Sequence, residues 1–155
     1  MLNPNTNQRE LAYVVTIDEI RPIPNYDRVE HARIGGWWVI VKKDQFKVGD
    51  LAIYIEVDSK VPEKEPFMFL DKRNFKVKTL KMCKVISQGL LMSPEDFGWT
   101  KGKDADGVLL INLGKEATND LPYLNAGDFL TELLKITYAD AEDNRRKANS
   151  ADKYK

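Results

Sequence analysis

The run Val29-Glu-His-Ala-Arg-Ile-Gly-Gly-Trp-Trp-Val-Ile-Val-Lys42 decides the fold of this 155-residue chain. Gly35 and Gly36 lie between two stretches that are rich in β-branched and aromatic residues. Two residues that readily adopt positive φ, placed between such stretches, are a strong signal for a β-hairpin. We therefore predict two antiparallel strands, residues 29–34 and 37–42, joined by a two-residue turn.

Strand-like segments continue on both sides of this hairpin. The segment before it is bounded by Pro22 and Pro24, and the segment after it alternates apolar residues on one face. We predict further strands at residues 11–20, 51–57, 75–79, 88–92 and 108–111. Residues 128–135 are the one stretch whose pattern favours a helix.

The strand segments before residue 93, separated by short turns, suit a small barrel or sandwich. A five-stranded Greek-key barrel of the OB type is the smallest closed arrangement that hides strand edges. The expected fold is therefore mainly β: an OB-type barrel with short helical elements and a C-terminal helix or linker. We place the domain at residues 1–135, with its core at 10–112, and a linker at 136–155.

Charge is neutral in total but segregated along the chain. There are 24 basic and 24 acidic residues. Residues 71–84 carry six basic residues against one acid, whereas residues 91–143 carry eleven acids against four bases. Residues 144–155 are basic again. Segregation of this kind gives a local positive field that a neutral total hides, although a solvated strand face beside an acidic loop would have the same pattern.

The sequence lacks the patterns of membrane, secreted and metal-dependent proteins. No apolar run approaches the roughly 20 residues that span a bilayer, and the first residues are polar. A lone cysteine, Cys83, favours a reducing, intracellular compartment, the cytoplasm first, with the nucleus or an organelle as alternatives. One histidine and one cysteine do not make a zinc cluster of the usual ligand types.

Nothing in the sequence has the pattern of an active site. There is no glycine-rich phosphate loop, and His31 falls in the middle of a predicted strand without a serine elbow near it. Cys83 lies in a basic stretch but has no second histidine or cysteine to act with it. We expect no catalytic, cofactor-binding or metal-binding residues in this segment.

Cations interleaved with aromatic rings indicate a polyanion-binding surface instead. Nucleic-acid binding needs positive charges along the phosphate backbone and flat rings on which bases stack. Trp37 and Trp38 point to opposite faces of a strand, so we expect one in the core and one exposed. The alternative is that both are packed. The candidate nucleic-acid-binding residues are Trp38, Lys42, Lys43, Lys72, Arg73, Phe75, Lys76, Lys78, Lys81 and Lys84.

Several separated motifs occur in an order that resembles a known family. They are Ile20-Arg-Pro-Ile-Pro-Asn-Tyr-Asp-Arg-Val-Glu30, the Gly35–Lys42 run, Phe46-Lys-Val-Gly-Asp50, Tyr54-Ile-Glu-Val-Asp-Ser-Lys-Val-Pro62 and Ile86-Ser-Gln-Gly-Leu-Leu-Met92. Residues 11–92 resemble the N-terminal OB domain of one branch of ATP-dependent RNA ligases, and the likeness continues weakly through 129–134. In that branch the OB domain precedes the nucleotidyltransferase domain and helps the enzyme engage nicked duplexes. Tyr26 departs from the pattern, which has a small residue between Asn25 and Asp27.

The resemblance implies a binding module rather than a complete enzyme. Such ligases attach AMP to the lysine of a Lys-x-Asp-Gly motif, and the nearest string here, Lys103-Asp-Ala-Asp-Gly107, is one residue too long. We therefore expect ATP and Mg²⁺ to be used only by a separate catalytic domain that acts in cis.

The expected function is to help such a ligase seal 3′-OH/5′-phosphate ends. The expected partner is nucleic acid, either a nicked duplex containing RNA or structured RNA, bound by a monomer with no membrane association. A structural or protein-interaction module and a tRNA-binding OB domain are the alternatives.

Overall fold

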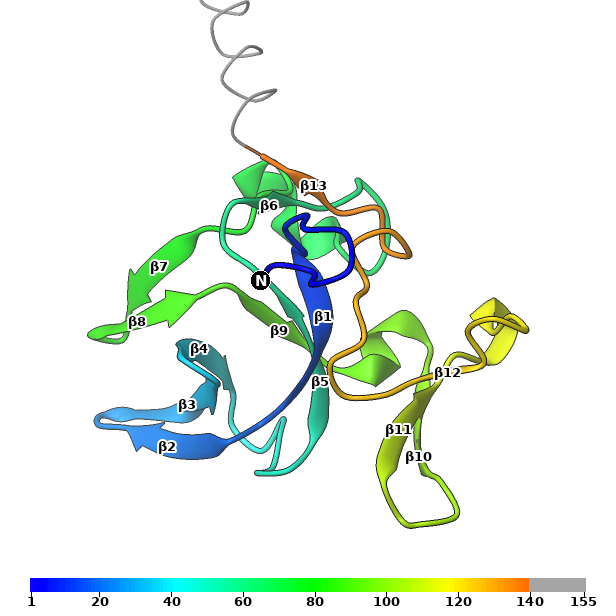
Figure 1. Cartoon of the computed structure of the whole chain (residues 1–155). Helices are drawn as coiled ribbons and strands as arrows, with labels where there is room; N and C mark the ends of the chain where they lie inside the picture. The colour runs from blue at the N-terminus through cyan, green and yellow to red at the C-terminus, as the bar shows by residue number, and fades with distance from the viewer. Residues whose placement is uncertain (140–155) are drawn as a thin grey trace, which may run out of the picture.

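The computed structural model describes residues 1–139, whose strands form a partly open barrel with an outer extension (Figure 1). The barrel strands are β1 (Ala12–Thr16), β2 (Glu19–Ile23), β3 (Tyr26–Ile34), β4 (Trp37–Lys42), β5 (Leu51–Ile55), β6 (Ser59–Lys60), β7 (Thr79–Met82), β8 (Val85–Gln88) and β9 (Leu90–Met92). The extension carries β10 (Thr100–Lys103), β11 (Leu109–Asn112) and β12 (Tyr123–Leu124), whereas β13 (Thr137–Tyr138) pairs with β6. The short 3₁₀ helices are η1 (Met68–Arg73), η2 (Pro94–Phe97) and η3 (Gly114–Glu116).

Strand order around the barrel confirms the predicted mainly β, OB-type fold. Strand β1 of sheet β1–β5–β9 leads directly into strand β2 of sheet β2–β3–β4. The two strands together therefore act as one long, bent first strand of the barrel. In the same way β8, which hairpins with β7, leads into β9. The circuit therefore runs from β1/β2 to β3, β4, β8/β9, β5 and back to β1. Every ladder within it is antiparallel, as in a partly open Greek-key barrel.

The barrel opens at one seam, between β4 and β8. Among the described residues no strand ladder joins these two strands. One side chain bridges them instead, since the backbone N–H of Ile40 on β4 donates to Ser87 Oγ on β8 at 2.9 Å. A second contact reaches β8 from the neighbouring β3, where His31 Nε2 lies 2.8 Å from the carbonyl oxygen of Ile86. Because side-chain bridges replace the ladder, this seam is where the barrel presents a groove.

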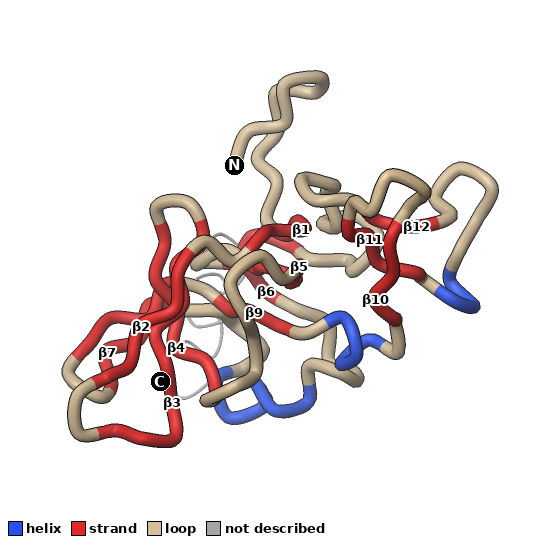
Figure 2. The backbone as a smooth tube through the Cα atoms, turned by 90° about the horizontal axis from the view of Figure 1, so that it is seen from below, coloured by secondary structure: helices blue, strands red, loops and turns tan. Residues whose placement is uncertain are grey.

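Sheet β1–β5–β9 is buried on both faces. The inner face fills the barrel with Tyr13, Ala52, Tyr54 and Leu91. The outer face carries a second cluster that includes Val14, Ile53, Ile55, Met92, Trp99, Ile111, Leu124 and Leu130. Figures 1 and 2 both show β10–β11–β12 on one side of this sheet and β2–β3–β4 on the other. The extension thus completes a second core outside the barrel.

Residues 128–135 do not form the helix that the sequence pattern favoured. Residues 128–130 lie along the edge of β1 instead, where Val14 N–H donates to the Asp128 carbonyl at 2.9 Å and Leu130 N–H donates to the Ala12 carbonyl at 2.8 Å. Leu130 is buried in the outer core. Backbone bonds to β1 hold the first part of the segment extended, and the local bonds of residues 131–135, such as Leu134 N–H to the Leu130 carbonyl at 2.9 Å, close a turn rather than a helix.

The packed part of the domain also runs past residue 135, where the linker was expected to begin. Ile136 and Ala139 are buried, and β13 between them pairs antiparallel with β6. Residues 136–139, the first four of the predicted linker, are therefore part of the fold. Ile136 and Ala139 pack in the interior, and Thr137 and Tyr138 make strand bonds to β6. The remainder of the predicted linker, 140–155, lies outside the described residues.

Gly89 sets the bend between β8 and β9. Its φ is +96°, and a Cβ added there would lie 2.5 Å from Tyr54 Oη. That hydroxyl donates to the Gln88 carbonyl at 2.7 Å. Only a residue without a side chain allows the backbone to approach the tyrosine this closely.

We predict that Gly89→Ala lowers the free energy of unfolding by about 3 kcal/mol, since it combines a steric clash with a strained φ. Gly107→Ala is the matched control, because Gly107 also has a positive φ (+81°) but a Cβ added there would meet nothing within 4 Å. It should cost only about 1 kcal/mol. Urea unfolding measures both, and equal losses for the two variants would contradict this account of Gly89.

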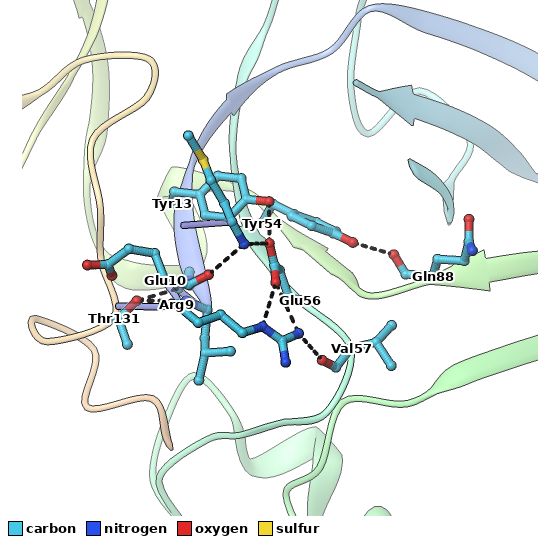
Figure 3. A network of polar contacts seen from close by, with 11 residues as sticks. Arg9, Glu10, Tyr13, Tyr54, Glu56, Val57, Gln88 and Thr131 are labelled. Carbon is cyan, nitrogen blue, oxygen red and sulfur yellow. Dashed lines mark hydrogen bonds and ion pairs between the residues drawn. The ribbon is translucent and has the colours of Figure 1, made fainter. Parts of the chain in front are cut away.

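Glu56 anchors the N-terminal segment to the end of β5. The carboxylate is 6% exposed and accepts hydrogen bonds from the Met1 ammonium at 2.6 Å, Tyr13 Oη at 2.7 Å and Arg9 at 3.1 Å (Figure 3). Burial alone would raise the pKa of Glu56. The bonds from the ammonium, the tyrosine and the arginine outweigh it and hold the pKa below its ordinary value. Burial and the bond to Glu56 raise the pKa of Tyr13.

We expect Glu56→Gln to lower the free energy of unfolding by about 2 kcal/mol at pH 7, because charge-assisted bonds become neutral ones. A depressed pKa in the folded state gives stability that is complete above the unfolded value of about 4.3 and is lost as pH falls through the folded pKa. The difference between the two proteins should therefore shrink in acid. Denaturant titrations between pH 7 and pH 3 test this, and a constant difference would refute it.

Candidate nucleic-acid interface

The barrel surface that the extension leaves uncovered is formed by β2–β3–β4 and hairpin β7–β8. Both lie away from β10–β12, across sheet β1–β5–β9 (Figures 1 and 2). Strands 2 and 3 of an OB barrel, with the loops after strands 1 and 4, are the usual ligand-binding surface of this architecture. Here those strands are β3 and β4, and the loop after the fourth barrel strand contains η1 and β7.

A groove of about 740 Å³ lies at the open seam. We call it the seam groove. Its walls come from the end of β4, from β7 and from η1, and its lining includes Val41, Lys42, Phe69, Leu80 and Met82. Phe69 is 56% exposed and Met82 is 45% exposed. The groove is therefore largely apolar, and its charged lining residues are Lys42 at the end of β4 and the acids Glu65 and Asp96.

Hairpin β7–β8 has one side toward the seam groove and one side away from it. Leu80 and Met82 line the groove. Lys81, between them, pairs with Ile86, and alternation along a strand places this pair on the other side. Lys81 and Lys84 are exposed, and neither has an ion pair within residues 1–139. The hairpin thus offers two unpaired cations beside the groove.

The outer face of β2–β3–β4 carries a stacked cluster. The Arg21 guanidinium lies 4.8 Å from the Trp38 ring centroid, and the His31 ring lies 4.7 Å from it. Glu19 accepts hydrogen bonds from both Arg21 and Arg33. These bonds, chiefly the one from Arg21, hold the pKa of Glu19 below its ordinary value. Arg21 and His31 were not among the site residues predicted from the sequence. What identifies these two residues as neighbours is the pairing of β2 with β3, whose register sets Arg21 opposite His31.

The aromatic part of the predicted site needs correction. Phe75 is 8% exposed and belongs to the outer core, so it is not a surface for bases. Trp38 is half-buried, and its ring already contacts Arg21 and His31. The expectation that one tryptophan of the pair is in the core is also wrong. Trp37 is 41% exposed, because it pairs with Ile34 next to the hairpin turn, where the barrel interior ends.

The predicted cations do not form a single track. Lys42 lines the seam groove beside hairpin β7–β8, which carries Lys81 and Lys84. Lys76 and Lys78 lie along β6 instead. The backbone of Lys76 forms an antiparallel β-bridge with that of Lys60, and Lys78 Nζ lies 3.8 Å from Asp58 Oδ1. The remaining cations are exposed: Lys72 and Arg73 end η1, and Lys43 lines a separate hollow.

Two further features of residues 1–139 bear on other kinds of site. No group of three or more His, Cys, Asp or Glu side chains there is arranged to hold a metal ion. No helix within the same range is long and apolar enough to cross a membrane.

Comparison with known proteins agrees with the OB-type fold. The sequence profile of an OB-fold domain family matches residues 11–94, more than half of the chain. The chain therefore belongs to this OB-fold domain family. No curated protein sequence matches it.

Among solved structures, the chain is similar to an RNA ligase of Naegleria gruberi. The ligase with PPi superposes with a TM-score of 0.66 at 27% identity, covering 86% of this chain and 36% of the ligase chain. A mutant of that ligase with ATP and Mn gives a TM-score of 0.65 at 27% identity over 85% and 36%. An apo mutant gives 0.66 at 27% identity over 86% and 36%. This chain thus spans about a third of the ligase's length, and the likeness fits the N-terminal OB domain of an RNA ligase.

Proposed function

We propose that this domain is the nucleic-acid-binding OB module of an ATP-dependent RNA ligase. It helps a catalytic domain in cis to engage nicked duplex, so that 3′-OH and 5′-phosphate ends are sealed there. The observation that carries the proposal is the likeness to the Naegleria RNA ligase, which extends over 86% of this chain at 27% identity. ATP, Mg²⁺ and the nucleophilic lysine belong to the catalytic domain in this proposal.

The seam groove and the outward side of hairpin β7–β8 are the proposed contact surface. Lys42, Lys81 and Lys84 supply positive charge there, and none of them has an ion pair within the described part of the chain. Lysines that contact phosphates position a strand without reading its sequence. A domain that assists sealing at any nick requires binding of that sequence-independent kind.

We expect the affinity for a nicked RNA-containing duplex to fall with salt, by about 0.9 in log–log slope for each phosphate engaged. The double substitution Lys81→Glu with Lys84→Glu should reduce the slope by about 1.8 and weaken binding at least roughly tenfold. Lys103→Glu with Lys115→Glu, on the extension, is the matched control and should bind as the wild type does. Fluorescence anisotropy at several salt concentrations measures both.

A second candidate function is docking of a protein, and the exposed apolar rim of the seam groove favours it. Phe69 and Met82 are large apolar side chains left open to solvent at its edge, and such patches often mark interaction sites. In that case the charge reversal on hairpin β7–β8 would leave nucleic-acid binding unchanged. Binding without salt dependence would likewise count against the first proposal.

A further inference from the structure

A second hollow, separate from the seam groove, lies at the turn between β2 and β3. Its volume is about 510 Å³. Pro22 has no N–H with which to extend the ladder, and the pairing of β2 with β3 shifts register between Pro22 and Ile23. Glu30 pairs with Pro22 while Tyr26 pairs with Ile23. The three residues between them in β3 therefore bulge away from β2, and the hollow forms beside this bulge.

The walls of the hollow combine three kinds of chemistry. Ile23 and Val29 give it an apolar base, and the ring of Tyr26, which is 38% exposed, gives it a flat wall. Asp27 and Glu30 add carboxylates, and Lys43 adds a cation.

Hydrogen bonding within the domain leaves part of this chemistry unused. Glu30 Oε1 accepts a bond from the Asp44 N–H at 2.8 Å, which fixes its position. The Asp27 carboxylate has no hydrogen-bonding partner within residues 1–139. Residues that carry an exposed ring, an unused acceptor and a cation therefore line one space.

We propose that this hollow holds one nucleotide of an RNA strand and recognises it as RNA. The base stacks on Tyr26, the ribose 2′-OH donates a hydrogen bond to the Asp27 carboxylate, and a neighbouring phosphate contacts Lys43. The inference rests on the proposed function, because it assumes that the domain binds nucleic acid, and it adds the sugar class of the bound strand.

Each assignment follows from the type of group. Stacking on an aromatic ring accepts any base, because every base has a π-face. A carboxylate only accepts hydrogen bonds, so it suits a hydroxyl and is unfavourable next to a phosphate. The 2′-OH is the group by which a protein distinguishes RNA from DNA. Lys43 is exposed and has no ion pair within the described residues, so it is available for the phosphate.

The test uses the 155-residue protein and two labelled single-stranded 12-mers of one sequence, RNA and DNA. Single strands avoid the difference in duplex shape. Wild type should prefer RNA by about five- to tenfold, the value of one hydrogen bond to a charged acceptor at an open site. Asp27→Asn should reduce this preference about threefold or more, because a neutral amide oxygen is a weaker acceptor than a carboxylate. Tyr26→Ala should weaken binding of both strands by about five- to a hundredfold.

Matched variants on the extension separate a local effect from a general one. Tyr123→Ala replaces a ring of similar exposure (42%) on β12, and Asp106→Asn replaces an exposed loop carboxylate. Both should bind as wild type does, and thermal melting should show that all four variants are folded. If wild type binds RNA but Tyr26→Ala and Asp27→Asn bind equally well with the same preference, this inference fails and the proposed function stands. If wild type binds neither strand nor the nicked duplex, the proposed function itself fails.

Discussion

The rest of the structure depends on sheet β1–β5–β9 having apolar side chains on both faces. Across β1 and β5, Tyr13 meets Tyr54 on the inner face and Val14 meets Ile53 on the outer face. A sheet of this kind is stable only when both faces are covered. Each Å² of apolar surface left in water costs about 25 cal/mol of stability. The inner face is covered by closing the barrel. The outer face requires another layer, which the extension supplies.

This constraint also decides which surface remains for function. The extension occupies the outer face of β1–β5–β9, so ligands reach the barrel from β2–β3–β4 and from hairpin β7–β8. Both the seam groove and the hollow beside Tyr26 lie on that side, and they share Val29 in their linings. Gly89 bends the last barrel strand around Tyr54 beside this seam. The proposed interface is therefore a consequence of how the two cores are built.

The sequence was sufficient to predict the central hairpin, because its pattern is local. Gly35 and Gly36 form the turn, and Trp37–Lys42 is a strand with the predicted bounds. The helix at 128–135 could not be excluded from its sequence, since what prevents it is bonding to β1, more than a hundred residues earlier. The position of Phe75 has a similar cause. Its burial depends on the outer core, many of whose members, such as Val14, Ile111 and Leu130, come from distant segments.

The candidate site was predictable in its charge but not in its geometry. Exposure of Lys42, Lys81 and Lys84 follows from their residue type, and the structure agrees. Which cations share a surface depends on strand pairing, and pairing with β6 separates Lys76 and Lys78 from the groove. Tyr26 was noted only as a departure from the family pattern. Its place beside a hollow results from the register shift at Pro22, which requires knowledge of the strand partner.

The central claim is that nucleic acid binds on the side of the barrel opposite the extension. Backbone chemical shifts of the ¹⁵N-labelled protein, recorded during titration with a nicked RNA-containing duplex, test it most directly. The account predicts that shift changes gather on β3, β4 and hairpin β7–β8, while β10, β11 and β12 stay unchanged. Changes centred on β10–β12, or none at a saturating concentration of duplex, would contradict it.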